Sequence, residues 1–210
     1  MGDRILWGVG TSRTIRAHWA LIWLGLEYEV RPIRTRTPDM DDPAFQALNP
    51  KGKIPTLQDG DLTLTESPAI VTYLAERYST PERRLIPEDV AERAAYFEAL
   101  AFIAMELDAT SMYVLRRHMD LPHIYGEAEA ANDAARGYFA RAIDAAAIRM
   151  QDGRRFMLGD DFSGADILMS SCINTATRYH LHVPDAFQAY QERVQALPET
   201  QAALKANTPS

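Results

Sequence analysis

Residues 49–70 read NPKGKIPTLQDGDLTLTESPAI, and this stretch decides how the N-terminal part of the chain folds. Its first feature is the Ile54-Pro55 bond, which lies between two segments expected to be extended. Proline removes most of the trans preference of the preceding peptide bond, so we expect this bond to be cis. A cis bond would turn the backbone N–H and C=O groups of Ile54 outward, toward a ligand with an extended backbone.

A tight antiparallel hairpin is predicted directly after this bond. Two short apolar-bearing runs, 56–58 and 62–64, flank the pair Asp59-Gly60, whose glycine tolerates a positive φ. The hairpin would lead the chain from the proline loop to the next element.

Glu66, Ser67 and Pro68 predict that this next element is a helix, with Ser67 as its N-cap and Pro68 at its first position. Free backbone N–H groups at a helix N-terminus attract anions. A ligand with an extended backbone, an α-amino group and an α-carboxylate would therefore match Ile54, Glu66 and Ser67 in turn.

The combination of proline loop, hairpin and Glu-Ser helix start resembles the glutathione site of the cytosolic glutathione S-transferase superfamily, and the resemblance extends from Ile5 to about Ala206. It implies glutathione as the co-substrate and requires no metal. The residues implied to bind glutathione are Lys53, Ile54, Pro55, Glu66 and Ser67. Lys53 could meet the glycine carboxylate of the tripeptide; the alternative is an ordinary solvated lysine.

Two hydroxyl residues, Thr11 and Ser12, precede a helix expected over 14–24 and are the candidates for activating the glutathione thiol. Lowering a thiol pKa from about 8.5 by about two units requires roughly 2.7 kcal/mol, which one hydrogen bond to the thiolate can supply. The stretch 12–16, SRTIR, resembles the serine-type first turn of several transferase classes, including bacterial ones, and favours Ser12. Counting back from Gly25 favours Thr11. One hydroxyl would activate the thiol and the other would cap the helix, and both assignments stay open.

The predicted elements follow the order of a thioredoxin-like fold, a βαβ unit and then a ββα unit. Their ranges are 5–9 (strand), 14–24 (helix), 28–33 (strand), the hairpin, and 68–78 (helix). Helical periodicity dominates thereafter, beginning with one long helix over 88–119. The expected fold is α/β plus all-α: a thioredoxin-like glutathione-binding domain over 1–78, a linker over 79–87 and a helix bundle over 88–210.

Within the helical domain, Ser163 and Asp166 form a Ser-x-x-Asp pattern that predicts a capping box at the start of a helix over 165–179. A matching box opens the core helix of this domain in the transferase family. Its role is structural, so neither residue is a candidate for the active site.

The acceptor substrate is expected to contact the long helix. Met105, Asp108, Met112 and Arg116 recur at three- and four-residue steps and would share one face, with Tyr113 beside it. Methionines next to an arginine suit an apolar electrophile that develops negative charge. The alternative is a core stripe or a dimer-facing stripe.

The composition agrees with a soluble cytoplasmic enzyme. The chain has 210 residues, 47% apolar content, a net charge of -7 and no basic run, which argues against nucleic acid and anionic membranes as partners. No stretch approaches the roughly 18 apolar residues of a membrane span. The single cysteine, Cys172, excludes an internal disulfide framework and fits a reducing compartment.

We therefore predict a homodimeric glutathione transferase that conjugates glutathione thiolate with a small electrophile, as in detoxification. The same thiolate could instead serve a peroxidase or an isomerase. A further alternative is a transferase-like binding module that binds glutathione without turnover.

Overall fold

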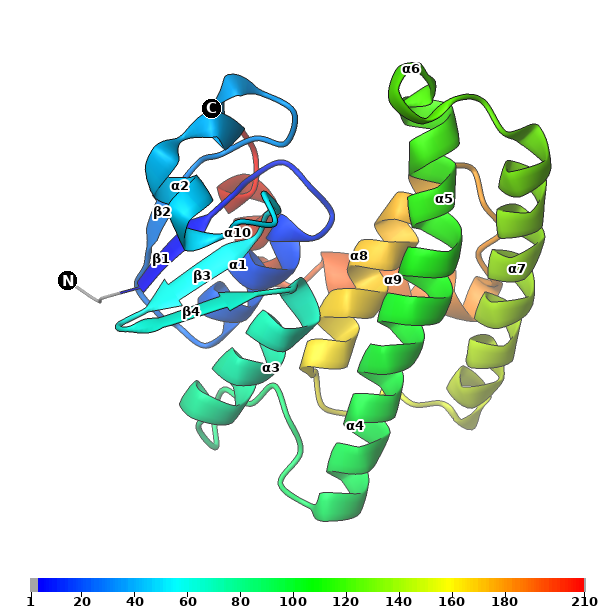
Figure 1. The fold of residues 1–210 in the computed structure, drawn as a ribbon. Coiled ribbons are helices and arrows are strands. Elements are labelled where there is room, and N and C mark those ends of the chain that lie inside the picture. Colours follow the sequence, from blue (N-terminus) through cyan, green and yellow to red (C-terminus); the bar gives the residue numbers. More distant parts are fainter. Residues whose placement is uncertain (1–3, 210) are drawn as a thin grey trace. The chain divides into compact units, whose positions relative to one another are not determined.

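The computed structural model describes residues 4–209, and the chain divides into two compact units (Figure 1). One unit contains the residues up to Ile86 together with those from Gln195 onward, and the other is Pro87–Val194. The expected helical domain, 88–210, therefore does not include the C-terminal residues. They join the first unit because helix α10 (Pro198–Ala206) packs against helix α1 (Thr14–Trp23).

The first unit contains a four-stranded mixed sheet in the order β2-β1-β3-β4, as the thioredoxin-like prediction requires. The strands are β1 (Arg4–Trp7), β2 (Glu29–Arg31), β3 (Thr56–Asp59) and β4 (Leu62–Thr65). Strand β1 pairs in parallel with β2 and antiparallel with β3. The predicted hairpin is confirmed, with Thr56 opposite Thr65 and Asp59 opposite Leu62.

Both faces of this sheet are covered because its side chains alternate between two apolar layers. On one face Trp7 packs with Ile33 and with Phe45 of helix α2 (Pro43–Leu48), and the two aromatic rings lie 5.8 Å apart. A short 3-10 helix, η1 (Pro38–Asp41), precedes α2. On the other face Leu6 and Leu57 are fully buried. This second face is the one available to helices α1 and α3 (Ser67–Tyr78), which pack against one another.

The second unit is mainly helical, and its other pairing among the described residues is an isolated β-bridge between Phe156 and Gly159. Its helices are α4 (Val90–Phe102), η2 (Ile103–Met112), α5 (Tyr113–Leu115), η3 (Arg116–Asp120), α6 (Pro122–Tyr125), α7 (Glu129–Ile148), η4 (Arg149–Asp152), α8 (Gly164–Arg178) and α9 (Asp185–Gln195). The α/β plus all-α fold class predicted from the sequence is thus confirmed.

The long helix expected over 88–119 is regular only in its first part. Segments η2 and η3 are π-helical, with hydrogen bonds that span five residues instead of four. Two side chains follow the same spacing: the hydroxyl of Thr110 donates to the Met105 carbonyl, and that of Ser111 donates to the Glu106 carbonyl. A π-helix turns less per residue than an α-helix, so side-chain faces assigned from α-helical spacing do not hold here.

Candidate functional site

The proline loop lies against the first strand. The Ile54-Pro55 bond is cis, as predicted. Gly8 follows β1 with a φ of +114°, and a Cβ atom at this position would lie 2.5 Å from the Ile54 Cβ. Glycine therefore allows the loop to approach the strand. Among the described residues no backbone hydrogen bond engages Ile54, so its N–H and C=O groups are available to a ligand.

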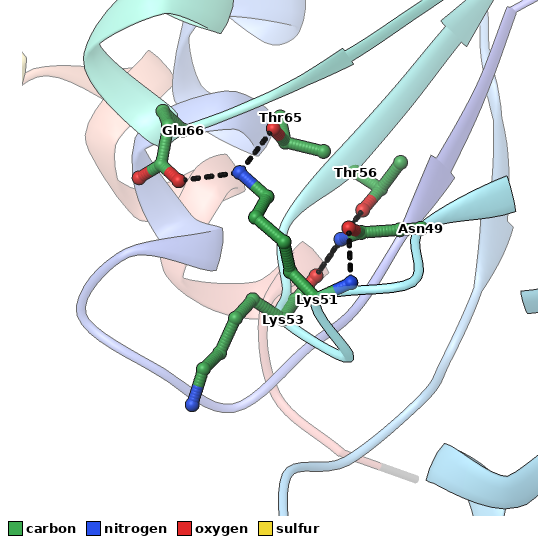
Figure 2. A network of polar contacts seen from close by, with 6 residues as sticks. All are labelled: Asn49, Lys51, Lys53, Thr56, Thr65 and Glu66. Carbon is green, nitrogen blue, oxygen red and sulfur yellow. Dashed lines mark hydrogen bonds and ion pairs between the residues drawn. The ribbon is translucent and has the colours of Figure 1, made fainter. Parts of the chain in front are cut away.

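Asn49 holds this loop in shape from inside (Figure 2). Its side chain is buried, and its Nδ2 donates to the Lys53 carbonyl at 2.7 Å and to Thr56 Oγ1 at 3.0 Å. Its Oδ1 accepts the backbone N–H of Lys51 at 3.2 Å. Three of the amide's hydrogen-bonding positions thus hold the backbone before Ile54 and the Thr56 side chain after it.

Glu66 lies at the N-cap position of α3 with a φ of +67°, which is unusual for a residue with a side chain. Such backbone strain costs roughly 1 to 3 kcal/mol and concentrates at functional sites. The carboxylate is exposed and pairs with Lys51 Nζ at 2.7 Å, while the same Nζ lies 2.8 Å from Thr65 Oγ1 (Figure 2). The Glu66 carboxylate therefore already binds an ammonium group.

Ser67 does not act as the N-cap, contrary to the sequence-based prediction. It is the first helical residue of α3, and no side chain caps this helix. Its buried Oγ instead accepts a hydrogen bond from Arg16 Nη1 at 3.3 Å. Arg16 belongs to α1 and is only 2% exposed. A buried guanidinium and a helix N-terminus thus create positive potential at Ser67, as a carboxylate receptor requires.

The two hydroxyls of the first turn have different surroundings. Thr11 Oγ1 accepts the backbone N–H groups of Arg13 at 3.3 Å and Thr14 at 3.0 Å, and lies 3.0 Å from Thr14 Oγ1. It therefore satisfies N–H groups at the start of α1, which is the function of a cap. Ser12 is half-buried, and its hydroxyl makes no hydrogen bond with the residues that the structure describes.

His18 supports the strand end at Gly8 without taking part in acid-base chemistry. Its Nε2 lies 3.2 Å from the Gly8 carbonyl and its Nδ1 2.8 Å from the Tyr28 hydroxyl. Because a carbonyl only accepts, Nε2 carries the proton and Nδ1 accepts from Tyr28. Burial lowers the pKa of His18 to about 4, so the ring is neutral at physiological pH.

The remaining expected glutathione residue, Lys53, lies apart from the polar cluster. Its side chain points away from the Lys51–Glu66 pair in Figure 2. From the sequence, Arg16 was expected either to raise the local positive potential or to pair with neighbouring acids, and no contact was expected for Lys51. The sequence contained one signal that Arg16 is buried: it lies within a predicted helix between two apolar residues, Ile15 and Ala17.

The substrate residues expected on the long helix do not share one face. Met105 is 64% exposed, whereas Asp108 and Met112 are buried. Tyr113 and Arg116 are half-buried. The π-helical segment η2 separates these positions, because its turns contain more residues than the α-helical spacing assumed. The prediction that Met105 and Met112 line one surface is therefore wrong.

Residues 4–209 contain no cluster of three or more histidine, cysteine or acidic side chains arranged to hold a metal ion. None of the helices in the same range is long and apolar enough to cross a membrane.

Residues 12–77 match the family model for the N-terminal domain of glutathione S-transferases. Glutathione S-transferase Z2 of Arabidopsis thaliana is 28% identical over 200 residues, which cover 92% of this chain and 86% of that protein. Glutathione S-transferase D7 of Drosophila melanogaster is 31% identical over 158 residues, or 72% of this chain and 65% of that protein.

Solved structures show the same likeness. The theta class glutathione S-transferase of Xanthomonas axonopodis pv. citri, solved with glutathione bound, aligns with a TM-score of 0.81 and 27% identity over 97% of this chain and 98% of that chain. A glutathione transferase of Methylococcus capsulatus aligns with a TM-score of 0.79 and 28% identity over the same shares. The sheet order, the proline loop and these likenesses agree, and the chain belongs to the glutathione S-transferase superfamily.

Proposed function

We propose that this protein is a serine-type glutathione transferase: it binds glutathione on its first unit, lowers the pKa of the glutathione thiol and adds the thiolate to a small electrophile. The observation that carries the proposal is the pair of consecutive residues at the start of α3. Glu66 offers an exposed carboxylate, and Ser67 offers a hydroxyl supported by the buried Arg16. Together they form a receptor for an α-amino group and an α-carboxylate on one carbon, the chemistry of the γ-glutamyl end of glutathione.

The rest of the tripeptide fits the proline loop. The free N–H and C=O groups of Ile54 would pair with the cysteine backbone of glutathione, and Pro55 keeps those groups outside the hairpin. Lys53 is proposed to reach the glycine carboxylate as a point charge. Because Asn49 fixes this loop before the ligand arrives, binding requires little additional ordering of the backbone.

Ser12 is proposed to activate the thiol, with Thr11 as the cap that positions the turn. The thiol proton leaves to solvent, and the thiolate accepts a hydrogen bond from the Ser12 hydroxyl. The sulfur electron pair then forms a bond to an electrophilic carbon, and the leaving group departs with its bonding pair. A hydrogen bond to a charged group is worth roughly 1.5 to 3 kcal/mol, enough to lower the thiol pKa by one to two units.

We propose that Tyr113 and Arg116 contact the electrophile. Both are half-buried and therefore partly accessible, whereas Met112 is buried. Arg117 lies over the Tyr113 ring, 4.8 Å from its centroid, which adds positive potential beside the aromatic surface. An electrophile that develops negative charge would be favoured. The same thiolate chemistry extends to hydroperoxides and to double-bond isomerisation.

We also propose a cytoplasmic location, because the chain has a single cysteine. The protein is further proposed to form a homodimer. The first part of α4 presents Val90, which is 81% exposed, and Phe97 seven residues later on the same face. Exposed large apolar side chains at helical spacing are typical of a protein interface. A second copy of the chain is the proposed partner, and Phe97→Glu should convert the dimer to a monomer in analytical ultracentrifugation.

Calorimetric titration with glutathione tests the binding site. Glu66→Ala should weaken binding by roughly 1.5 to 3 kcal/mol, because it removes the carboxylate that receives the ammonium group. Glu82→Ala, an exposed carboxylate of the same unit, is the matched control and should bind normally. Unchanged affinity in the Glu66 variant would contradict the proposed receptor.

Turnover is tested separately with three classes of co-substrate: halogenated aromatics, hydroperoxides and maleyl-type isomerisation substrates. Conjugation with the aromatic class is the expected result. Glutathione binding without turnover in any class would instead identify a binding module.

A further inference from the structure

Asn207, which follows helix α10, is hydrogen-bonded to the turn that carries Thr11 and Ser12. Its backbone carbonyl accepts the Gly10 N–H at 2.8 Å, and its side-chain Oδ1 lies 3.1 Å from the same nitrogen. Its Oδ1 also accepts the Thr14 hydroxyl at 2.6 Å, and its Nδ2 donates to the Thr11 carbonyl at 3.1 Å. One side chain at the end of α10 thus binds the turn on both sides of Ser12.

These bonds also determine where the hydroxyl protons of the turn point. Thr14 has one hydroxyl proton and two acceptors within reach, Asn207 Oδ1 at 2.6 Å and the Thr11 carbonyl at 3.0 Å, and we assign the proton to the shorter contact. The Thr14 oxygen can then only accept, so at the 3.0 Å contact between the two hydroxyls Thr11 is the donor. The Thr11 proton is therefore directed into the turn. Of the two candidate hydroxyls, only that of Ser12 keeps its proton for a ligand.

We propose that Asn207 is a positioning residue for thiol activation: through Thr14 it engages the Thr11 hydroxyl and holds Ser12 as the only hydroxyl that can donate to the glutathione thiolate. This inference rests on the proposed function, since it requires glutathione at this turn. It assigns a role in catalysis to a residue outside the region 12–77 that matches the N-terminal family model. Packing of α10 against α1 brings Asn207 to the turn.

The test is the titration of the thiol of bound glutathione, followed by thiolate absorbance in the full-length protein. Asn207→Ala should raise the thiol pKa by about one unit and lower the turnover number at neutral pH about tenfold, with recovery at higher pH, as expected for a weakened hydrogen bond to a charged group. The dissociation constant for glutathione should change less than about twofold, because Ile54, Glu66 and Ser67 are untouched.

Two further variants separate positioning from general loosening. Thr208→Ala removes a hydroxyl bond to the Leu204 carbonyl in the same tail without touching the turn, and it should retain the wild-type thiol pKa. Thr14→Val removes the hydroxyl through which Asn207 acts. It should shift the thiol pKa as Asn207→Ala does, and the double variant should shift it no further.

A wild-type thiol pKa in Asn207→Ala, together with a raised one in Ser12→Ala, overturns the inference and leaves the proposed function intact. Equal shifts in Asn207→Ala and Thr208→Ala also overturn it, because they indicate a loosened tail. If Ser12→Ala, Thr11→Ala and Asn207→Ala all titrate as the wild type does, the inference and the serine-type activation both fail.

Discussion

Hydroxyl residues precede both α1 and α8, but the two helix starts differ in what these hydroxyls do. At α8, Ser163 and Asp166 form the predicted capping box, and both are buried. The Asp166 carboxylate accepts from the Ser163 N–H, the Ser163 hydroxyl, the Met157 N–H and the Tyr190 hydroxyl at 2.8 to 2.9 Å. At α1, Thr11 takes the cap contacts and the half-buried Ser12 hydroxyl has no partner among residues 4–209.

The start of α8 therefore serves to stabilise the fold, whereas the start of α1 keeps one hydroxyl available for a ligand. A closed set of buried hydrogen bonds stabilises the fold, and removing any member leaves polar groups unsatisfied. An unengaged hydroxyl beside a helix N-terminus adds little stability and is available to an anion. Mutations at α8 should therefore change folding, and mutations at Ser12 should change chemistry.

The largest expected effect is on stability, in Asp166→Ala. The variant leaves the Ser163 N–H, the Met157 N–H and the Tyr190 hydroxyl without their buried acceptor, so it should lose about 4 kcal/mol of unfolding free energy. Urea unfolding followed by circular dichroism measures this loss. A loss below about 1 kcal/mol would show that the capping box is not the structural centre that its burial indicates.

The pH dependence of the unfolding free energy should reveal the contribution of the Asp166 carboxyl group. Burial raises the pKa of Asp166 from 3.8 to about 6. A carboxyl whose pKa is raised by folding contributes its stability at low pH and loses it as the pH rises from about 4 to 6, by up to roughly 3 kcal/mol. Asp166→Asn removes this contribution, so the stability difference between wild type and variant should shrink by that amount across this range. A constant difference would contradict the raised pKa.

A crossed pair of serine variants should sharpen the comparison. Ser12→Ala should lower conjugation at neutral pH by about ten- to a hundredfold, because one hydrogen bond to the thiolate is lost, while stability changes by less than about 0.5 kcal/mol. Ser163→Ala should do the reverse, losing about 1 kcal/mol of stability and leaving glutathione affinity unchanged. Steady-state kinetics and urea unfolding of both variants measure these two effects. Loss of stability in Ser12→Ala would mean that this hydroxyl is structural.

Thr11→Ala should affect stability at α1, by about 1 kcal/mol, because two N–H groups lose their acceptor. Thr11→Ser retains the hydroxyl and should keep wild-type stability. If Thr11→Ala shifts the thiol pKa and Ser12→Ala does not, the two hydroxyls have been assigned in the wrong order.

The smallest expected effect is at a third helix start, that of α3. Lys51 pairs with Glu66, so the ammonium of glutathione must displace it. Both side chains are exposed, and such a pair is worth less than about 1 kcal/mol. Lys51→Met should therefore bind glutathione up to about threefold more tightly in calorimetry, whereas Lys53→Met should bind it more weakly. Weaker binding in Lys51→Met would show that Lys51 contacts the ligand itself.

Much of the fold followed from sequence because local chemistry decides it. The cis bond, the Asp59-Gly60 hairpin and the capping box at Ser163 each depend on neighbouring residues, and each is present. The prediction that the substrate residues share one face of the long helix was wrong, because the spacing of apolar residues does not reveal that η2 is π-helical. Ser67 was misassigned as a cap because its partner, Arg16, lies 51 residues away.

The sequence by itself determined the superfamily resemblance, the order of the elements and the set of residues at each helix start, because these depend on short-range propensities and turn chemistry. Only the tertiary structure decided which of those residues are engaged. Asn207 lies 196 residues from Thr11 in the chain, and packing of α10 on α1 brings them together. At this turn Thr11 and Thr14 engage one another and the distant Asn207, and the Ser12 hydroxyl makes no hydrogen bond with residues 4–209.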